Sequence, residues 1–196
     1  GYNFLFGAEE SHGYLLGTLT RDKDAVVSSA TLCEIASHAK RRGLTLVDLL
    51  HRLYEKYGVY SDVVHPILFP DTKDGKGQMA ACLSTLRQCP PEKVGENAVT
   101  IIEDYETLLR LDCRSGKTSP IGEQKSDLIL WKLADGSRVV IRPSGTEPKI
   151  KLYCSAKSTV DSTVEAAFEK CREKTAELLS ALTRMIRAQS QVRSNT

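Results

Sequence analysis

The sequence predicts an α+β fold, in which part of an α/β domain is followed by a complete unit of strands and helices. Three observations lead to this expectation. Residues 1–57 hold one strand-like run and two helical stretches. Residues 58–187 hold five strand-like runs, with a helix after the first of them and another after the last. The dipeptide Asp135-Gly136 is typical of a tight hairpin, which joins antiparallel neighbours.

The first part is short of strands. Asn3–Gly7 is its one strand-like run, and a helix with small residues at helical spacing is expected to end at Gly43. A second helix is expected to begin at Thr45, which forms a capping pair with Asp48, and to stop at Gly58. One strand and two helices make a poor core by themselves. We therefore expect residues 1–57 to be the carboxyl-terminal part of an α/β domain.

The second part, residues 58–187, is predicted to be a complete domain. Asp112–Lys125 is rich in Gly, Ser, Lys and Pro and is expected to be a mobile loop. Residues 188–196 have little apolar content and are expected to form a disordered tail. A long helix is expected to start at Ser158, with Asp161 as its capping partner. The other expected elements are a helix at Asp71–Gln88 and strands at Val59–Phe69, Ala98–Glu103, Leu128–Leu133, Arg138–Ile141 and Ile150–Cys154.

Composition favours a soluble protein of the cytoplasm. The chain has 196 residues, a net charge of +2 and no apolar run near the length of a membrane span, which is about 20 residues. The charge is too small to indicate nucleic-acid binding. The six cysteines contain no C-x-x-C pair, and we expect free buried thiols in a reducing compartment.

Between two expected strands lies Arg142-Pro143-Ser144-Gly145-Thr146-Glu147-Pro148, a sequence suited to binding phosphate. Arg142 offers a planar fork of donors, Ser144 and Thr146 offer hydroxyl groups, and Gly145 lets a backbone N–H approach closely. The two prolines reduce the loop entropy that is lost on binding. The alternative is a tight turn with a surface arginine.

Two lysines follow this loop on one face of the next strand. Lys151 is interpreted as protection of a sheet edge. Lys149 is left open between that role and phosphate capture. Three of the four histidines, His38, His51 and His65, have no metal-ligand spacing.

The residues from Arg142 to Lys151 resemble the phosphate-binding loop in the last domain of the α-D-phosphohexomutases, which include phosphoglucomutases, phosphomannomutases and phosphopentomutases. Gly7-Ala8-Glu9-Glu10-Ser11-His12-Gly13-Tyr14 is similar to the sugar-binding loop of their third domain. Arg21-Asp22-Lys23-Asp24-Ala25-Val26 resembles the branch with bacterial phosphoglucomutases and phosphopentomutases. The order and separation of the motifs also fit this family.

The resemblance implies that the last domain is an antiparallel sheet covered by helices, like the TATA-binding protein in fold. It also implies that Arg142, Ser144, Gly145 and Thr146 bind the phosphate of a phosphosugar. Glu9 and Ser11 would hold sugar hydroxyl groups, which suits carboxylate and hydroxyl partners. His12 does not match the family's histidine position and is interpreted as an exposed bystander.

Two family motifs do not appear in the sequence: the Thr-x-Ser-His-Asn-Pro-like loop of the phosphorylated serine and the Asp-Gly-Asp-x-Asp-Arg loop of the metal. Asp22 and Asp24 stand at the head of a helix, where we expect capping rather than metal binding. We expect the chain to be the carboxyl-terminal part of a longer enzyme and to be inactive alone. The resemblance implies Mg²⁺ for the whole enzyme, with no ligands here, and a sugar bisphosphate intermediate.

The expected function is therefore to position substrate in the interconversion of sugar 1-phosphate and sugar 6-phosphate, with glucose favoured. The expected partners are the phosphosugar and the amino-terminal domains of the same enzyme. One alternative is a stand-alone phosphosugar-binding module without catalysis. Another is a nucleic-acid-binding sheet, which would need clustered basic and aromatic residues. The preferred sugar and the oligomeric state stay open.

Overall fold

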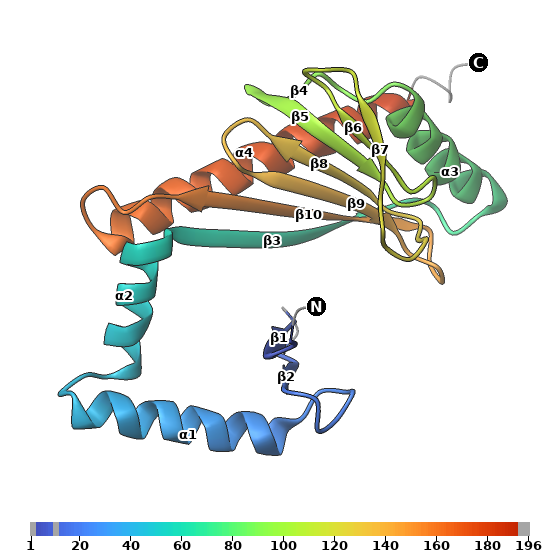
Figure 1. The fold of residues 1–196 in the computed structure, drawn as a ribbon. Helices are drawn as coiled ribbons and strands as arrows, with labels where there is room; N and C mark the ends of the chain where they lie inside the picture. Colours follow the sequence, from blue (N-terminus) through green and yellow to red (C-terminus); the bar gives the residue numbers. More distant parts are fainter. Residues whose placement is uncertain (1–2, 10–11, 192–196) are drawn as a thin grey trace. The chain divides into compact units, whose positions relative to one another are not determined.

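The computed structural model describes residues 3–9 and 12–191, with side chains up to residue 188. The chain divides into two compact units, with the boundary between Lys56 and Tyr57. Figure 1 shows the elements of both units, and each unit is described by itself.

The first unit contains a small hairpin and two helices. Strand β1 (Phe6–Ala8) pairs antiparallel with β2 (Tyr14–Leu16). The helices are α1 (Ala25–Arg41) and α2 (Leu46–Tyr57). The expected strand at Asn3–Gly7 thus begins later, and β2 was not expected, because three residues are too few to show a periodic pattern.

Both helix starts are capped as the sequence predicts. The Asp24 side chain accepts hydrogen bonds from the backbone N–H groups of Val26 and Val27, each at 3.0 Å. Thr45 Oγ1 accepts from the Asp48 N–H at 3.1 Å, and the Asp48 carboxylate accepts from the Thr45 N–H at 2.7 Å. These bonds satisfy N–H groups that the first helical turn leaves without partners.

The first unit has little core among its described residues. Its one buried hydrophobic residue is Ala39 on α1, and α2 buries none. Large apolar side chains on both helices are exposed instead: Val26, Leu32, Ile35, Leu46, Val47, Leu50, Leu53 and Tyr57. The stability of this unit therefore rests on few buried contacts.

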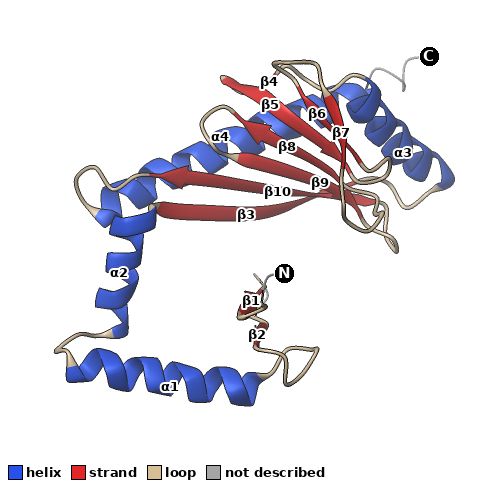
Figure 2. Ribbon diagram, in the orientation of Figure 1, coloured by secondary structure: helices blue, strands red, loops and turns tan. Residues whose placement is uncertain are grey.

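The second unit is an antiparallel sheet with two helices on one face, which confirms the predicted fold class. The strand order is β3-β10-β9-β8-β5-β6-β7, with β4 paired to β5. Figure 2 shows α3 (Lys73–Gln88) and α4 (Val164–Gln191) beside this sheet. The strands are β3 (Val59–Leu68), β4 (Lys93–Val94), β5 (Asn97–Asp104), β6 (Leu109–Asp112), β7 (Thr118–Pro120), β8 (Ile129–Leu133), β9 (Arg138–Pro143) and β10 (Lys149–Ser158).

Alternation along the central strands separates a buried face from an open one. On β10, Ile150, Leu152 and Cys154 are fully buried, while the residues between them are partly exposed. Trp131 on β8 is also fully buried and belongs to the same hydrophobic core. The core is completed from the helices by Cys82, Leu83, Leu86, Leu178, Leu182 and Ile186.

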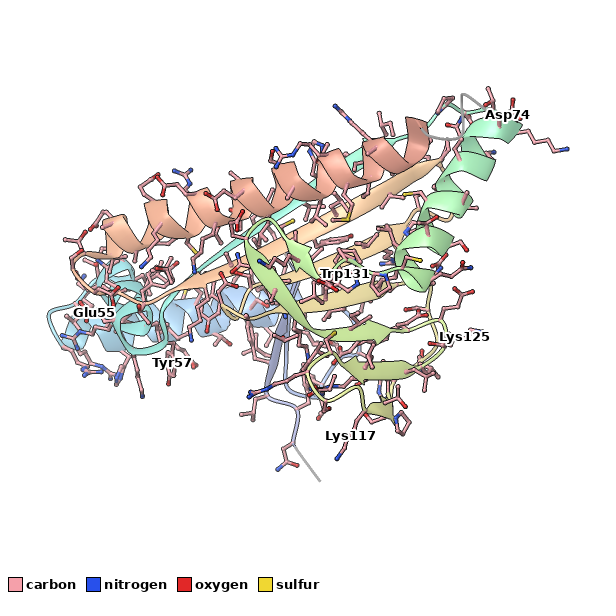
Figure 3. All side chains as sticks on the ribbon, turned by 90° about the horizontal axis from the view of Figure 1, so that it is seen from above. Glu55, Tyr57, Asp74, Lys117, Lys125 and Trp131 are labelled. Carbon is pink, nitrogen blue, oxygen red and sulfur yellow. The ribbon has the colours of Figure 1, made fainter. Side chains whose placement is uncertain are left out.

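Three expected features of this unit are wrong. The expected mobile loop contains β7, which pairs with β6 and extends the sheet; Figure 3 shows Lys117 and Lys125 at this margin. Helix α4 begins at Val164, because the Thr163 hydroxyl accepts from the Ala166 N–H, whereas Ser158 still belongs to β10. The helix also continues to Gln191, three residues beyond residue 188, where the tail was expected to start. Residues 192–196 lie outside the described part.

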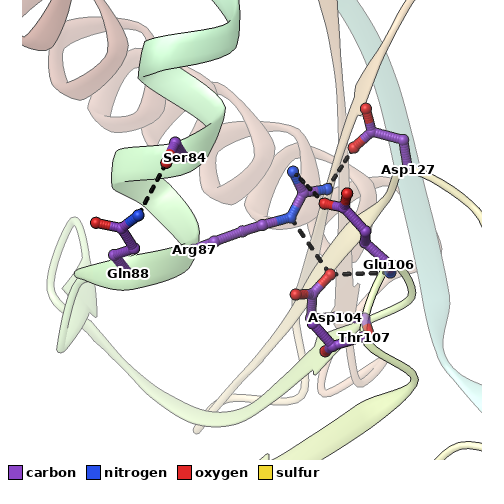
Figure 4. A network of polar contacts seen from close by, with 7 residues as sticks. All are labelled: Ser84, Arg87, Gln88, Asp104, Glu106, Thr107 and Asp127. Atoms are coloured by element: carbon purple, nitrogen blue, oxygen red, sulfur yellow. Dashed lines mark hydrogen bonds and ion pairs between the residues drawn. The ribbon is translucent and has the colours of Figure 1, made fainter.

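Helix α3 is tied to the sheet by a network around Arg87 (Figure 4). The guanidinium Nε lies 3.4 Å from an Asp104 oxygen, and Nη1 lies 2.9 Å from Glu106. A third ion pair joins Arg87 to Asp127. Burial opposes the charge of Arg87, but these carboxylates, Asp127 foremost, outweigh burial and raise its pKa.

The cysteines are all free, and only half of them are buried as expected. Burial raises the pKa of both Cys82 and Cys154 to about 11. The Cys171 thiol donates to the Ala156 carbonyl at 3.1 Å. The exposed ones are Cys33, Cys89 and Cys113. Among the described residues, no helix has the length and apolar character needed to cross a membrane.

Candidate functional site

The predicted phosphate loop joins two strands inside the sheet. Strand β9 ends at Pro143, and β10 starts at Lys149. The strands are antiparallel neighbours, with Pro143 opposite Ile150 and Arg142 opposite Lys151. Arg142 lies on the open face of the sheet, because its neighbour Ile141 is fully buried on the other face.

Backbone hydrogen bonds close this loop at its base. The Ser144 N–H donates to the Lys149 carbonyl at 2.9 Å, and the Lys149 N–H donates to the Glu147 carbonyl at 2.8 Å. The Phe69 N–H donates to the Pro148 carbonyl at 2.8 Å, which attaches the loop to the end of β3. The loop is therefore held on two sides before any ligand arrives.

Several donors of the loop have no partner within the described part of the chain. These are the side chain of Arg142, which is exposed, and the backbone N–H groups of Gly145 and Thr146. A Cβ built on Gly145 meets no atom within 4 Å, so the glycine leaves open space around the backbone. A guanidinium, N–H groups and the Ser144 and Thr146 hydroxyls are a set of donors that suits phosphate oxygens.

The two lysines after the loop do not protect an edge. Strand β10 pairs with β3 on one side and with β9 on the other, so it is internal. The interpretation of Lys151 as edge protection is therefore wrong. Lys151 lies opposite Arg142, and cross-strand partners share a face of the sheet.

The predicted sugar loop is the turn of the β1–β2 hairpin in the other unit. The Glu9 N–H donates to the Gly13 carbonyl at 2.8 Å, and the His12 N–H donates to the Glu9 carbonyl at 3.2 Å. His12 has a φ of 63° and is exposed. Ser11, the second predicted sugar contact, lies outside the described residues.

A residue that the sequence analysis did not assign to the site holds Glu9. The Lys23 ammonium lies 2.7 Å from the Glu9 carboxylate. The Lys23 side chain passes over Gly13, where a Cβ would lie 2.5 Å from its Cδ atom. Gly13 thus leaves room for Lys23 to reach Glu9. The nearest sequence signal was the Arg21–Asp24 motif, whose acids were interpreted as helix caps.

A cavity of about 830 Å³ adjoins this loop within the first unit. Its lining combines Phe6 and Tyr14 of the hairpin, whose rings lie 6.3 Å apart, with Leu32 and Ile35 of α1. His12, Gly13 and Lys23 also line it. Most of this lining is apolar, so the cavity offers few partners for sugar hydroxyl groups.

The acids near this loop do not fit a metal site. Asp24 caps α1, and Asp22 accepts a hydrogen bond from the Lys23 N–H at 2.7 Å. Within the described part, no group of three or more His, Cys, Asp or Glu residues could hold a metal ion. A Mg²⁺ ion would need several such oxygen ligands or water bridges to them.

The fold and the loop define a class of α+β proteins in which an arginine-containing loop joins two inner strands of a helix-covered antiparallel sheet. Two family models match the sequence. The phosphoglucomutase/phosphomannomutase alpha/beta/alpha domain III matches residues 1–57, and the C-terminal domain of the same enzymes matches residues 119–178. The chain belongs to the phosphoglucomutase/phosphomannomutase family.

Similar proteins agree with this assignment. A phosphoglucomutase of Staphylococcus aureus strain RF122 is 39% identical over 158 residues, which cover 79% of this chain and 28% of the relative. That of strain N315 is 38% identical over the same shares. The crystal structure of pp63/parafusin, a Paramecium phosphoglucomutase, matches 89% of this chain and 30% of its own, with a TM-score of 0.53 at 18% identity. This last likeness shows the fold alone.

Proposed function

We propose that this chain supplies the substrate-positioning part of a phosphohexomutase that interconverts sugar 1-phosphate and sugar 6-phosphate, with glucose as the favoured sugar. The observation that carries the proposal is the loop after Arg142, in which unpartnered donors stand between two inner strands. The curated relatives at 38–39% identity are phosphoglucomutases, which supports the choice of reaction and sugar.

In this proposal the two loops bind different parts of one substrate. Arg142, Ser144, Gly145 and Thr146 hold the phosphate that does not react. Glu9 and Ser11 hold sugar hydroxyl groups, and Lys23 keeps the Glu9 carboxylate in place through their ion pair. Binding energy from the remote phosphate is then available to align the reacting end of the sugar.

The transfer itself would use residues beyond those of this chain, which spans 28% of the length of its curated relatives. A phosphoserine would give its phosphoryl group to a sugar hydroxyl and form a sugar bisphosphate. The other phosphate would then return to the serine. Mg²⁺ would neutralise charge in both transfers, in a cytoplasmic enzyme. The acids among the described residues do not fit its site, so its ligands would come from the other domains.

A stand-alone phosphosugar-binding module is the second candidate, because the phosphate loop is closed by its own backbone hydrogen bonds. Activity separates the two proposals. The first proposal predicts that the longer enzyme converts glucose 1-phosphate into glucose 6-phosphate, whereas the second predicts that the whole native protein binds the phosphosugar without converting it. Residues 1–196 alone should bind without conversion in both cases.

Titration of the chain with glucose 6-phosphate, followed by amide NMR shifts, tests the binding step. The Gly145 and Thr146 signals should move on addition of glucose 6-phosphate and stay in place on addition of glucose. Arg142→Ala removes a charge-assisted fork, which should cost about 2–4 kcal/mol, or about 30- to 1000-fold in affinity. Arg142→Lys should recover only part, because an ammonium lacks the planar fork. Equal binding of glucose and glucose 6-phosphate would refute the proposal.

A further inference from the structure

Lys149 lies at the point where the phosphate loop joins β10 and is fixed there by backbone hydrogen bonds. Its N–H donates to the Glu147 carbonyl, and its own carbonyl accepts from the Ser144 N–H, at 2.8 and 2.9 Å. Its side chain is only 20% exposed, although β10 has the open face of the sheet on one side. The sheet-edge role left open for it does not apply, because β10 is an internal strand.

The ammonium of Lys149 is engaged by the carboxylate of Glu147, with which it forms an ion pair. Glu147 belongs to the phosphate loop, and its side chain is 60% exposed. A carboxylate in a phosphate loop is unexpected, since like charges disfavour each other at short range. The ion pair gives this carboxylate a role within the loop, because it neutralises a largely buried lysine that has no other anion nearby among the described residues.

We propose that Lys149 is a further phosphate-binding residue and that Glu147 is its internal counter-ion, which an incoming phosphate displaces. Glu147 thereby competes with phosphate for the same ammonium and limits how tightly the loop holds it. This inference rests on the proposed function. In a mutase whose bisphosphate intermediate must turn, a phosphate loop that releases its ligand readily allows the two phosphates to exchange places.

A merely structural account makes a different prediction. If Lys149 only screened Glu147, removal of the carboxylate would leave the lysine without a role in binding. Lys149→Met would then have no effect in a chain that already carries Glu147→Gln. If Lys149 contacts phosphate, the same substitution still weakens binding.

The test is the dissociation constant of inorganic phosphate, measured by NMR titration of the 196-residue chain at fixed ionic strength. Glu147→Gln should tighten binding about fivefold, and Lys149→Met should weaken it about tenfold. The double variant should bind at least tenfold more weakly than Glu147→Gln alone. In the unsubstituted chain, the Lys149 side-chain methylene signals should shift with the same midpoint as the Gly145 amide.

Lys157→Met is the matched control. Lys157 lies on the same face of β10, eight residues and roughly 27 Å along the strand, which is several Debye lengths at physiological salt. Its loss should leave the affinity within twofold. The inference would be overturned if the double variant bound phosphate with a dissociation constant within twofold of that of Glu147→Gln. It would also be overturned if the Lys149 side-chain signal did not shift. If Arg142→Ala still abolishes binding in that case, the proposed function stands; if the unsubstituted chain does not bind phosphate, both fall.

Discussion

Replacement of Arg87 by methionine should destabilise the second unit measurably without any change to the phosphate loop. Arg87 lies on α3, while its three carboxylate partners lie on β5, on the turn after it and before β8. Methionine retains an aliphatic stem that can pack in the same space, so the substitution removes mainly the charge. The experiment therefore isolates the ionic link between the helix layer and the sheet.

The expected cost follows from the exposure of each partner. Glu106 and Asp127 are 48% and 53% exposed, and loss of such pairs costs about 0–1 kcal/mol each. Asp104 is only 17% exposed, and after the substitution it becomes a largely buried carboxylate without its cation. A fully buried charge left unpaired costs about 3–5 kcal/mol, so this shallower site should contribute less. The sum is about 2 kcal/mol, or roughly 8 °C in Tm for a unit of this size.

Urea unfolding with tryptophan fluorescence measures this directly. Trp131 is the only tryptophan of the chain and is fully buried in the core of the second unit. Arg172→Met is the matched control, because Arg172 on α4 is 71% exposed and pairs only with Glu169 among the described residues. That control should change stability by less than about 0.5 kcal/mol. A cost for Arg87→Met that is no larger than the control's would refute the argument.

Three further predictions follow from the described contacts. Burial opposes the charge of Asp135, but hydrogen bonds from Ser137 and Lys174 lower its pKa below 3.8, so Asp135→Asn should cost about 1 kcal/mol at neutral pH. In urea unfolding repeated at lower pH, the difference from the unsubstituted chain should start to shrink near pH 3.8 and vanish only below the lowered pKa. Cys82 and Cys154 have pKa values of about 11 and should not react with a thiol reagent at pH 7.5 until urea unfolds the chain. Cys33 and Cys89 are exposed and should account for a fast phase of the reaction in the folded chain. Hydrogen exchange should be fast throughout the first unit and slow in the central strands of the second, and uniformly slow exchange would contradict the burial pattern.

Local chemistry explains which parts of the fold the sequence could predict. The caps at Asp24 and Thr45 depend on atoms two or three residues away, and both form as expected. The predicted start of α4 was wrong, because by sequence alone Ser158 is as good a cap as Thr163. Strand pairing excludes Ser158 as the cap, since β10 continues through Ser158, which pairs with Val59. That partner is about 100 residues away, beyond the reach of a local pattern.

In the candidate site, too, the features that depend on neighbouring residues could be predicted, and those that depend on distant strand pairing could not. The donors at Arg142 and in the turn after it can be recognised from a short segment of sequence, and none of the described residues pairs with the Arg142 side chain or with the Gly145 and Thr146 N–H groups. The role of Lys151 depended on whether β10 lies at an edge, which only the complete strand order decides. The Lys23–Glu9 pair joins the turn of the β1–β2 hairpin to a residue beyond β2. Its sequence signal was an acidic and basic cluster that is also typical of a helix start.

The two loops also differ in how firmly the chain holds them. Ile141 and Ile150, on either side of the phosphate loop, are fully buried, so both of its ends are fixed in the main core. The sugar loop joins two strands of three residues each, in a unit that buries only Ala39 among its described hydrophobic residues. An ion pair half-exposed to solvent holds Glu9. Ordering a loop costs about 1–2 kcal/mol per residue in backbone entropy. The phosphate loop is already ordered by its buried ends, so little of this entropy is lost when phosphate binds. For the proposed mutase, this means that phosphate meets a preformed site, whereas the hydroxyl contacts adapt to a sugar that must bind in two orientations.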